Sequence, residues 1–163
     1  MHFIPDGPAI HQIPVDRLSG HGVVWQIDRV PFELITPDHL RGLAPRHEPG
    51  DMLLLDSGWA ARWGTDSYHQ HPSFTVEAAQ WIVDAGFTLV AIDLATPDLA
   101  LSERPAGFDW PVHQVLLSNG VLIVEHLDAP TALAGSRVEV VVGAAKITDA
   151  DGAPARVIAR GIG

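Results

Sequence analysis

The 163 residues are enough for one domain with a hydrophobic core, and a hydrophobic share of 47% indicates a globular chain rather than a disordered one. Ten Lys and Arg against 20 Asp and Glu give a formal net charge of −10, which argues against nucleic acid or an anionic membrane as a partner. The lack of cysteine excludes disulfides, thiolate metal sites and a cysteine nucleophile. With no signal-peptide pattern and no apolar stretch long enough to span a bilayer, the sequence predicts a cytoplasmic protein.

The first half of the chain predicts strands and helices in alternation. In chain order they are a strand at 22–30, a short helix beginning at Thr36-Pro37, a strand at 52–55 and a helix at 76–85. The run at 52–55 is Met-Leu-Leu-Leu, which is typical of a strand buried on both faces. Thr75 is expected to cap the longer helix and Gly86 to end it. The polar stretch at 57–74 predicts a long loop.

The second half predicts further strands and short helices. They are a buried strand at 89–92, a long loop at 95–111, a helix at 112–119, a buried strand at 121–124, a short helix at 131–133, and strands at 137–147 and 155–159. Asp151-Gly152 predicts a turn that joins the last two strands in a hairpin. These elements indicate an α/β fold, a single domain over residues 1–163 with a mixed β-sheet flanked by short helices.

Three carboxylates follow the predicted buried strands: Asp56, Asp93 and Glu125. Because open α/β sheets place ligands at the carboxyl ends of their strands, these residues are candidates for one cleft. The alternative is that each begins a solvated loop. His113 and Glu125 also lie at the two ends of a helix–strand unit, and imidazole with carboxylate suits zinc or manganese. An ordinary hydrogen-bonded helix histidine is the competing interpretation.

A histidine pair and the lack of common catalytic motifs also bear on function. His69 and His71 form a close pair that is able to pick up a metal, although a solvated loop is the favoured interpretation. The sequence has no nucleophile elbow, phosphate-binding loop or dinucleotide fingerprint.

Five motifs in order carry the strongest functional signal. They are His2-Phe3-Ile4-Pro5-Asp6-Gly7-Pro8, the segment 50–59 with Trp63-Gly64, Ala91-Ile92-Asp93 with Thr96-Pro97-Asp98, Pro111-Val112-His113, and Val124-Glu125. Together they resemble the metal-dependent cyclase family of hydrolases, which includes bacterial kynurenine formamidases and isatin hydrolases. The resemblance extends over essentially the whole sequence and implies a cyclase-like swivelling β/β/α fold.

The resemblance also implies a set of site residues. Of the family motif His-x-Gly-Thr-His-x-Asp-x-Pro-x-His-Phe, only the closing His-Phe is present, so an N-terminally truncated chain is expected, without the family's first strands and principal metal ligands. His2 then matches the catalytic, proton-transferring histidine, and His113 and Glu125 match ligands of a second metal. The implied cofactor is a divalent metal, zinc or manganese, whose binding to this chain is expected to be weak or absent. Candidates for an aromatic substrate pocket are Trp59, Trp63 and Phe74.

The implied function is hydrolysis of an amide, formamide or lactam bond in a small, aromatic substrate. Such an activity is arylformamidase-like and belongs to tryptophan/kynurenine catabolism. The alternative is a catalytically inactive protein that binds a small ligand or assists biosynthesis. Whether the missing motif is encoded upstream stays open. Loss of strands would expose a sheet edge, so a homo-oligomer, a dimer or tetramer, is expected.

Overall fold

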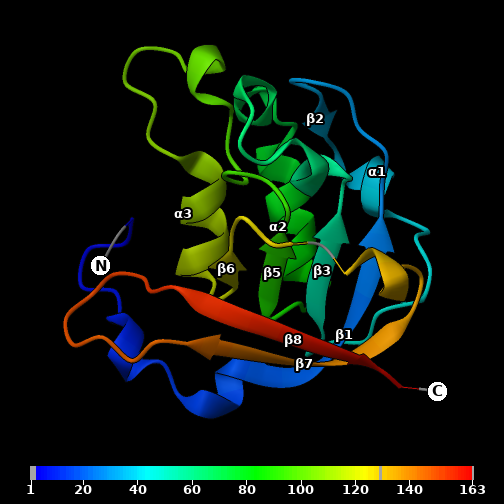
Figure 1. Ribbon diagram of the computed structural model, residues 1–163. Helices are drawn as coiled ribbons and strands as arrows, with labels where there is room; N and C mark the ends of the chain where they lie inside the picture. The colour runs from blue at the N-terminus through cyan, green and yellow to red at the C-terminus, as the bar shows by residue number, and fades with distance from the viewer. Residues whose placement is uncertain (1–2, 129, 163) are drawn as a thin grey trace.

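A computed structural model describes residues 3–128 and 130–162, and a curled mixed sheet forms its centre (Figure 1). The strand order is β6-β5-β3-β1-β7-β8. The strands are β1 (Ser19–Gln26), β3 (Met52–Asp56), β5 (Leu89–Ile92), β6 (Leu122–Val124), β7 (Arg137–Ala144) and β8 (Ala155–Gly161). The first four are parallel to one another, whereas β7 pairs antiparallel with both β1 and β8. The predicted α/β fold with a mixed sheet is therefore confirmed.

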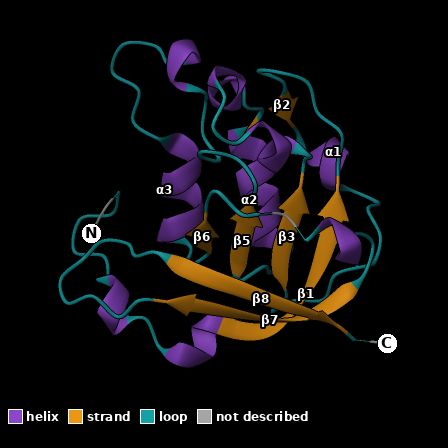
Figure 2. Ribbon diagram, viewed as in Figure 1, coloured by secondary structure: helices purple, strands orange, loops and turns teal. Residues whose placement is uncertain are grey.

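Short helices and a small second sheet complete the structure (Figure 2). The α-helices are α1 (Pro37–Leu40), α2 (Val76–Asp84) and α3 (Pro111–Ser118). The 3-10 helices are η1 (Ile10–Gln12), η2 (Val15–Leu18), η3 (Trp59–Arg62), η4 (Asp66–Gln70), η5 (Leu101–Glu103) and η6 (Thr131–Leu133). The second sheet is a parallel pair, β2 (Leu34–Ile35) with β4 (Ser73–Phe74). No helix in the described ranges is long and apolar enough to cross a membrane.

The two central parallel strands, β3 and β5, are buried on both faces because different layers cover each side. Alternate residues of β3, such as Leu53 and Leu55, pack into a cluster with residues of α2 and α3. Leu54 points to the opposite face and packs with the inward valines of β7. Each fully buried leucine of this kind contributes about 1.5–3 kcal/mol. This arrangement explains the continuous apolar run that predicted β3.

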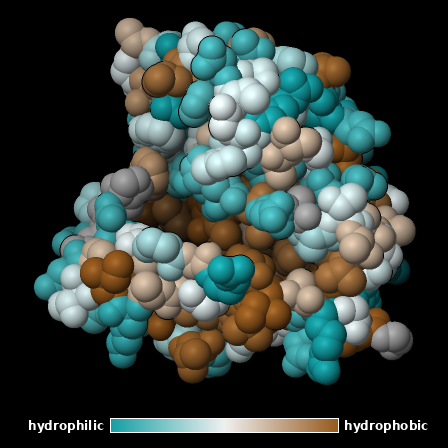
Figure 3. Space-filling view, in the orientation of Figure 1, coloured by the Kyte–Doolittle hydropathy of each residue, from teal (hydrophilic) through white to brown (hydrophobic). Residues whose placement is uncertain are grey.

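The second cluster is not fully covered. The space-filling view shows a hollow with apolar surface between the helical layer and β8 (Figure 3). Leu122, Val124 and Val157 pack against this cluster but are only partly buried. The prediction of a fully buried strand at 121–124 is therefore wrong, because β6 is an edge strand with a neighbour, β5, on one side.

Local signals explain the longest helix well. Thr75 Oγ1 accepts a hydrogen bond from the Ala78 amide at 3.1 Å, so the predicted N-cap of α2 is confirmed. Gly86 follows the helix with φ +82°, a conformation that disfavours other residues. The predicted loop at 57–74 instead contains η3, η4 and β4.

Candidate active site

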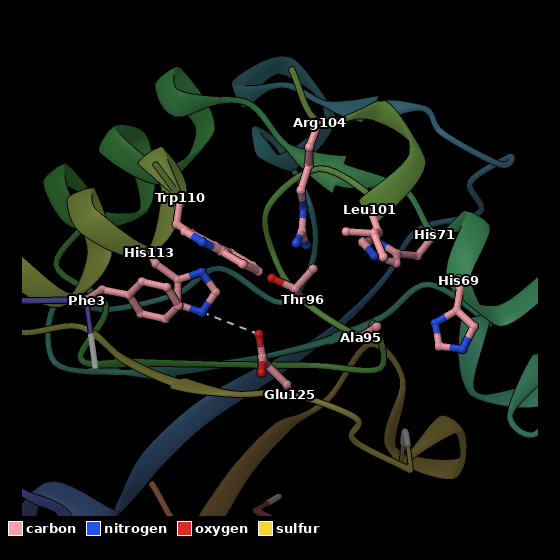
Figure 4. Close-up of a pocket in the computed structure, with 10 residues that line it drawn as sticks. All are labelled: Phe3, His69, His71, Ala95, Thr96, Leu101, Arg104, Trp110, His113 and Glu125. Carbon is pink, nitrogen blue, oxygen red and sulfur yellow. Dashed lines mark ion pairs between the residues drawn. The ribbon is translucent and has the colours of Figure 1, made fainter. Parts of the chain in front are cut away.

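A cavity of about 320 Å³ opens beside α3 and the carboxyl end of β6 (Figure 4). Phe3 and Trp110 form its aromatic wall, with ring centroids 5.3 Å apart. His113 and Glu125 face one another across its lower side, and Arg104 enters from above. The cavity therefore combines an apolar wall with a small number of convergent polar groups, which is the usual composition of a small-molecule site.

Asp98 fixes the histidine of this site. Its carboxylate accepts the backbone amides of Val112 at 2.9 Å and His113 at 3.1 Å, and it therefore caps α3 from a distant loop. The same carboxylate lies 2.6 Å from His113 Nδ1. The Asp98 and His113 side chains are both buried, with 1% and 7% of their surface exposed. Nδ1 is thus engaged, and the Nε2 atom of His113 is left to face the cavity.

Glu125 lies on the other side of that imidazole. It directly follows β6, and its Oε1 atom is 3.4 Å from His113 Nε2 (Figure 4). Burial lowers the pKa of His113, but the hydrogen bonds that the protonated ring donates to the Asp98 and Glu125 carboxylates outweigh this effect, so the pKa lies above the usual value. If Nδ1 carries a proton toward Asp98, the electron pairs of Nε2 and Oε1 face each other. Such a contact is favourable when a proton or a cation lies between the two atoms.

The fit of a metal to these residues is incomplete. A ligating histidine commonly donates its other N–H to a carboxylate, as His113 is placed to do toward Asp98. A catalytic zinc, however, generally uses three protein ligands. Within residues 3–128 and 130–162, no group of three or more His, Cys, Asp or Glu side chains is arranged to hold a metal ion. His113 and Glu125 alone therefore do not fit a catalytic metal, and His2 lies outside the described residues.

Of the three carboxylates that follow strands, Glu125 alone lines the cavity. Asp93 is buried and accepts the backbone amides of Ser57, Trp59 and Ala60. It also accepts the Ser57 hydroxyl at 2.7 Å, so its role is to shape the loop after β3. Asp56 is buried as well, and its Oδ1 accepts the Gly58 amide at 2.9 Å. The expectation of a shared cleft is corrected for both, because they serve turns within the protein.

The three aromatic residues expected at the pocket lie elsewhere. Trp59 and Phe74 are 1% and 2% exposed and belong to the core cluster under α2. Trp63 is 64% exposed and packs against Tyr68 and His126. None of the three lines this cavity, since hydrophobic packing has drawn two of them into the core.

The histidine pair is divided: His69 is exposed, as a solvated loop predicts, whereas His71 is not. His69 and His71 both line the cavity, and His71 is 2% exposed rather than solvated. Burial lowers the pKa of His71, and its Nδ1 lies 2.8 Å from the Pro72 carbonyl. His71 is therefore a neutral residue at neutral pH, with Nδ1 as the donor to that carbonyl.

Strained backbone flanks the site on both sides. Trp110, directly before α3, has φ 58°, and His126, directly after Glu125, has φ 56°. Non-glycine residues rarely adopt this left-handed region and do so at a cost of about 1–3 kcal/mol. His126 is held there by its amide, which donates to the Leu94 carbonyl at 2.9 Å, and by Nδ1, 2.9 Å from the Tyr68 hydroxyl. The two turns aim the Trp110 and Glu125 side chains at the cavity (Figure 4).

Residues 1–99 match a family of proteins described as Putative cyclase. The chain belongs to this cyclase family. The resemblance that the sequence motifs indicated is thus confirmed, and solved structures of similar fold agree with it. No functionally curated protein matches the chain.

Solved structures of similar fold include a potential metal-dependent hydrolase with cyclase activity, with a TM-score of 0.78 and 25% identity over 96% of this chain and 72% of that chain. A predicted metal-dependent hydrolase from Bacillus stearothermophilus has a TM-score of 0.71 and 26% identity over 93% of this chain and 69% of that one. Isatin hydrolase A from Ralstonia solanacearum has a TM-score of 0.79 and 20% identity over 95% of this chain and 65% of that chain. At this identity the likeness shows the fold alone. Together the family and the two neighbours called metal-dependent hydrolases support a hydrolase-like function in general terms.

Proposed function

We propose that this cyclase-family protein hydrolyses a C–N bond, in an amide, formamide or lactam, of a small aromatic compound. The activity would be arylformamidase-like, and a catalytic zinc or manganese would need a further ligand besides His113 and Glu125. The observation that carries the proposal is the contact series Asp98–His113–Glu125 at one side of an aromatic-walled cavity. The neighbours called metal-dependent hydrolases support the same class.

The size of the cavity favours a small substrate. At about 320 Å³ it lies near the lower end of the range for ligand pockets, about 300–1,000 Å³. Phe3 and Trp110 present ring surfaces to it, and aromatic pairs in offset or tilted arrangements are worth about 0.5–1.5 kcal/mol beyond the area they bury. A single aromatic ring with a carbonyl substituent therefore suits the space and its wall.

The polar pair supports proton transfer during hydrolysis. Water that attacks a carbonyl carbon must lose a proton, and the leaving nitrogen must gain one as the C–N bond breaks. Glu125 is placed to accept the first proton. His113, 3.4 Å away and fixed by Asp98, is placed to pass a proton to the nitrogen. The same two side chains are potential metal ligands, one fewer than a catalytic zinc uses.

A hydrolysis assay tests the proposal. The purified protein, supplied with MnCl2 or ZnCl2, would be incubated with N-formylkynurenine and with isatin, and product would be followed by absorbance. We expect saturable turnover that EDTA abolishes. The absence of turnover of both compounds with either metal would contradict the proposal.

The incomplete ligand set favours a second candidate, a protein that binds a small aromatic ligand without hydrolysing it. Trp110 lies in the cavity wall, so a bound ring would change tryptophan fluorescence. Saturable fluorescence change without turnover and without about one metal ion per chain would support this candidate over the enzyme.

A further inference from the structure

Arg104 enters the cavity from the loop between η5 and α3, and its plane is fixed by three contacts. The Nε atom donates to the Leu99 carbonyl at 2.8 Å. The guanidinium carbon lies 3.9 Å from the centroid of the Trp110 ring and 5.3 Å from that of Phe108. Stacking on an aromatic face and one directed hydrogen bond restrict the motion of this long side chain. Because the side chain is already ordered, it loses less conformational entropy on binding a further group than a mobile arginine would.

These contacts leave the forked end of the guanidinium available. The Leu99 contact uses one of the five N–H donors of the side chain. Asp98 and Glu125 attract the Arg104 charge through space, but no carboxylate among the described residues lies within ion-pair distance of it, whereas other arginines of the chain, such as Arg137, are directly paired. Figure 4 shows its terminal nitrogens pointing into the cavity above Thr96. The half-buried cation therefore presents donors to the same space that His113 and Glu125 border.

A structural role explains part of this arrangement. The hydrogen bond to Leu99 and the stacking on Trp110 hold the loop at 99–110 against the cavity. That role needs the Nε atom and the face of the guanidinium, and it does not need terminal donors that face the cavity. A fixed planar fork of N–H donors matches the two oxygens of a carboxylate, with which arginine forms paired, charge-assisted hydrogen bonds.

We propose that Arg104 is a specificity-determining residue that binds a carboxylate group of the substrate. The substrate class is then an aryl compound with its carboxylate at Arg104, its ring against Phe3 and Trp110, and its carbonyl–nitrogen bond near His113 and Glu125. The identity of the reacting bond rests on the proposed function, whereas the recognition of an aryl carboxylate does not.

Benzoate and benzamide are matched probes, since they have nearly the same shape and differ in charge. Their binding to the full chain would be measured by tryptophan fluorescence and calorimetry at neutral pH. We expect benzoate to bind at least about tenfold more tightly, because hydrogen bonds to charged groups contribute about 1.5–3 kcal/mol. Equal affinities for the two probes in the unaltered protein would overturn the proposal, whatever the variants do.

Two variants separate recognition from loop anchoring. Arg104→Gln is expected to weaken benzoate binding at least about tenfold and to leave benzamide binding within about twofold. Arg62→Gln is the matched control, because Arg62 also stacks on a tryptophan, 4.3 Å from the Trp59 centroid, but does not line the cavity. It is expected to change neither affinity. Equal weakening of both probes by Arg104→Gln would show a loop-anchoring role and overturn the proposal.

The two proposals fail in different ways. Benzoate binding that depends on Arg104, without hydrolysis of any C–N bond, would contradict the proposed function and leave the recognition of carboxylates intact. Hydrolysis that is equally efficient for neutral and carboxylated aryl amides would contradict the role of Arg104 and leave the hydrolase proposal intact.

Discussion

Asp98 Oδ2 lies 2.6 Å from His113 Nδ1, and the same carboxylate also accepts the amides at the start of α3. One buried side chain therefore caps the helix and sets the direction of the imidazole. Any movement of Asp98 would displace the helix end and the histidine together. The stability of the fold and the geometry of the cavity are linked at this residue.

We expect Asp98→Ala to lower the free energy of unfolding by about 2–4 kcal/mol, measured by urea denaturation. The loss of a cap costs about 0.5–2 kcal/mol, and buried groups that lose their partner cost about 1–3 kcal/mol. Thr75→Ala is the control. Thr75 caps α2 through a single contact with the Ala78 amide, whereas Asp98 contacts two amides and the His113 ring. It is expected to cost about 1 kcal/mol. Equal losses in the two variants would show that Asp98 acts as a simple cap.

Gly22 allows β1 and β3 to lie close together. A Cβ atom at this position would lie 2.3 Å from the Met52 carbonyl oxygen, far inside contact distance with the backbone of a buried strand. We expect Gly22→Ala to destabilise the protein by about 3 kcal/mol or more, as a lowered urea midpoint, because overpacking a rigid interior costs about 1–3 kcal/mol and occasionally more.

The neighbouring Gly20 provides the comparison. A Cβ atom there would meet Met52 Cε at 3.7 Å, an ordinary contact. Gly20→Ala should therefore be tolerated. Similar midpoints for the two variants would mean that β1 and β3 are not as close as described.

Asp93 organises the loop after β3 without lining the cavity. Asp93→Asn replaces one acceptor oxygen by an NH2 group, which is a donor. The oxygens of Asp93 face backbone amide donors, such as Trp59 N at 2.6 Å, so one donor would then face another. We expect a loss of about 2–4 kcal/mol in the free energy of unfolding, since buried donors lose their acceptor. Asp38→Asn, at an exposed surface pair with Arg41, should leave stability nearly unchanged. A tolerated Asp93→Asn variant would contradict the structural role.

The sequence predicted best where local signals determine the structure. Continuous apolar runs identified β3 and β5, and Thr75 with Gly86 bounded α2. The partial exposure of β6 was missed, because an edge position depends on the order of strands that are distant in the chain. His113 and Glu125 were found as a pair because they flank one helix–strand unit.

The remaining site residues depend on contacts that no local pattern reports. Asp98 contacts His113, which lies 15 residues further along the chain, across a loop that contains η5. Arg104 is oriented by Trp110, on whose ring it stacks. Composition likewise does not distinguish a core tryptophan such as Trp59 from a pocket tryptophan such as Trp110. The left-handed conformation of His126 has no signal in its neighbours, since tertiary hydrogen bonds impose it.

In the proposed function, a C–N bond is hydrolysed beside His113. The most direct measurement is kcat/KM for N-formylkynurenine in the presence of manganese, compared between the unaltered protein, His113→Ala and His47→Ala. His47 packs among Trp25, Trp81 and Phe87, away from this cavity, and serves as the matched control. We predict a loss of at least about 100-fold for His113→Ala, the lower bound for removal of a proton-transfer residue, and little change for His47→Ala. Turnover that survives His113→Ala unchanged would contradict the account.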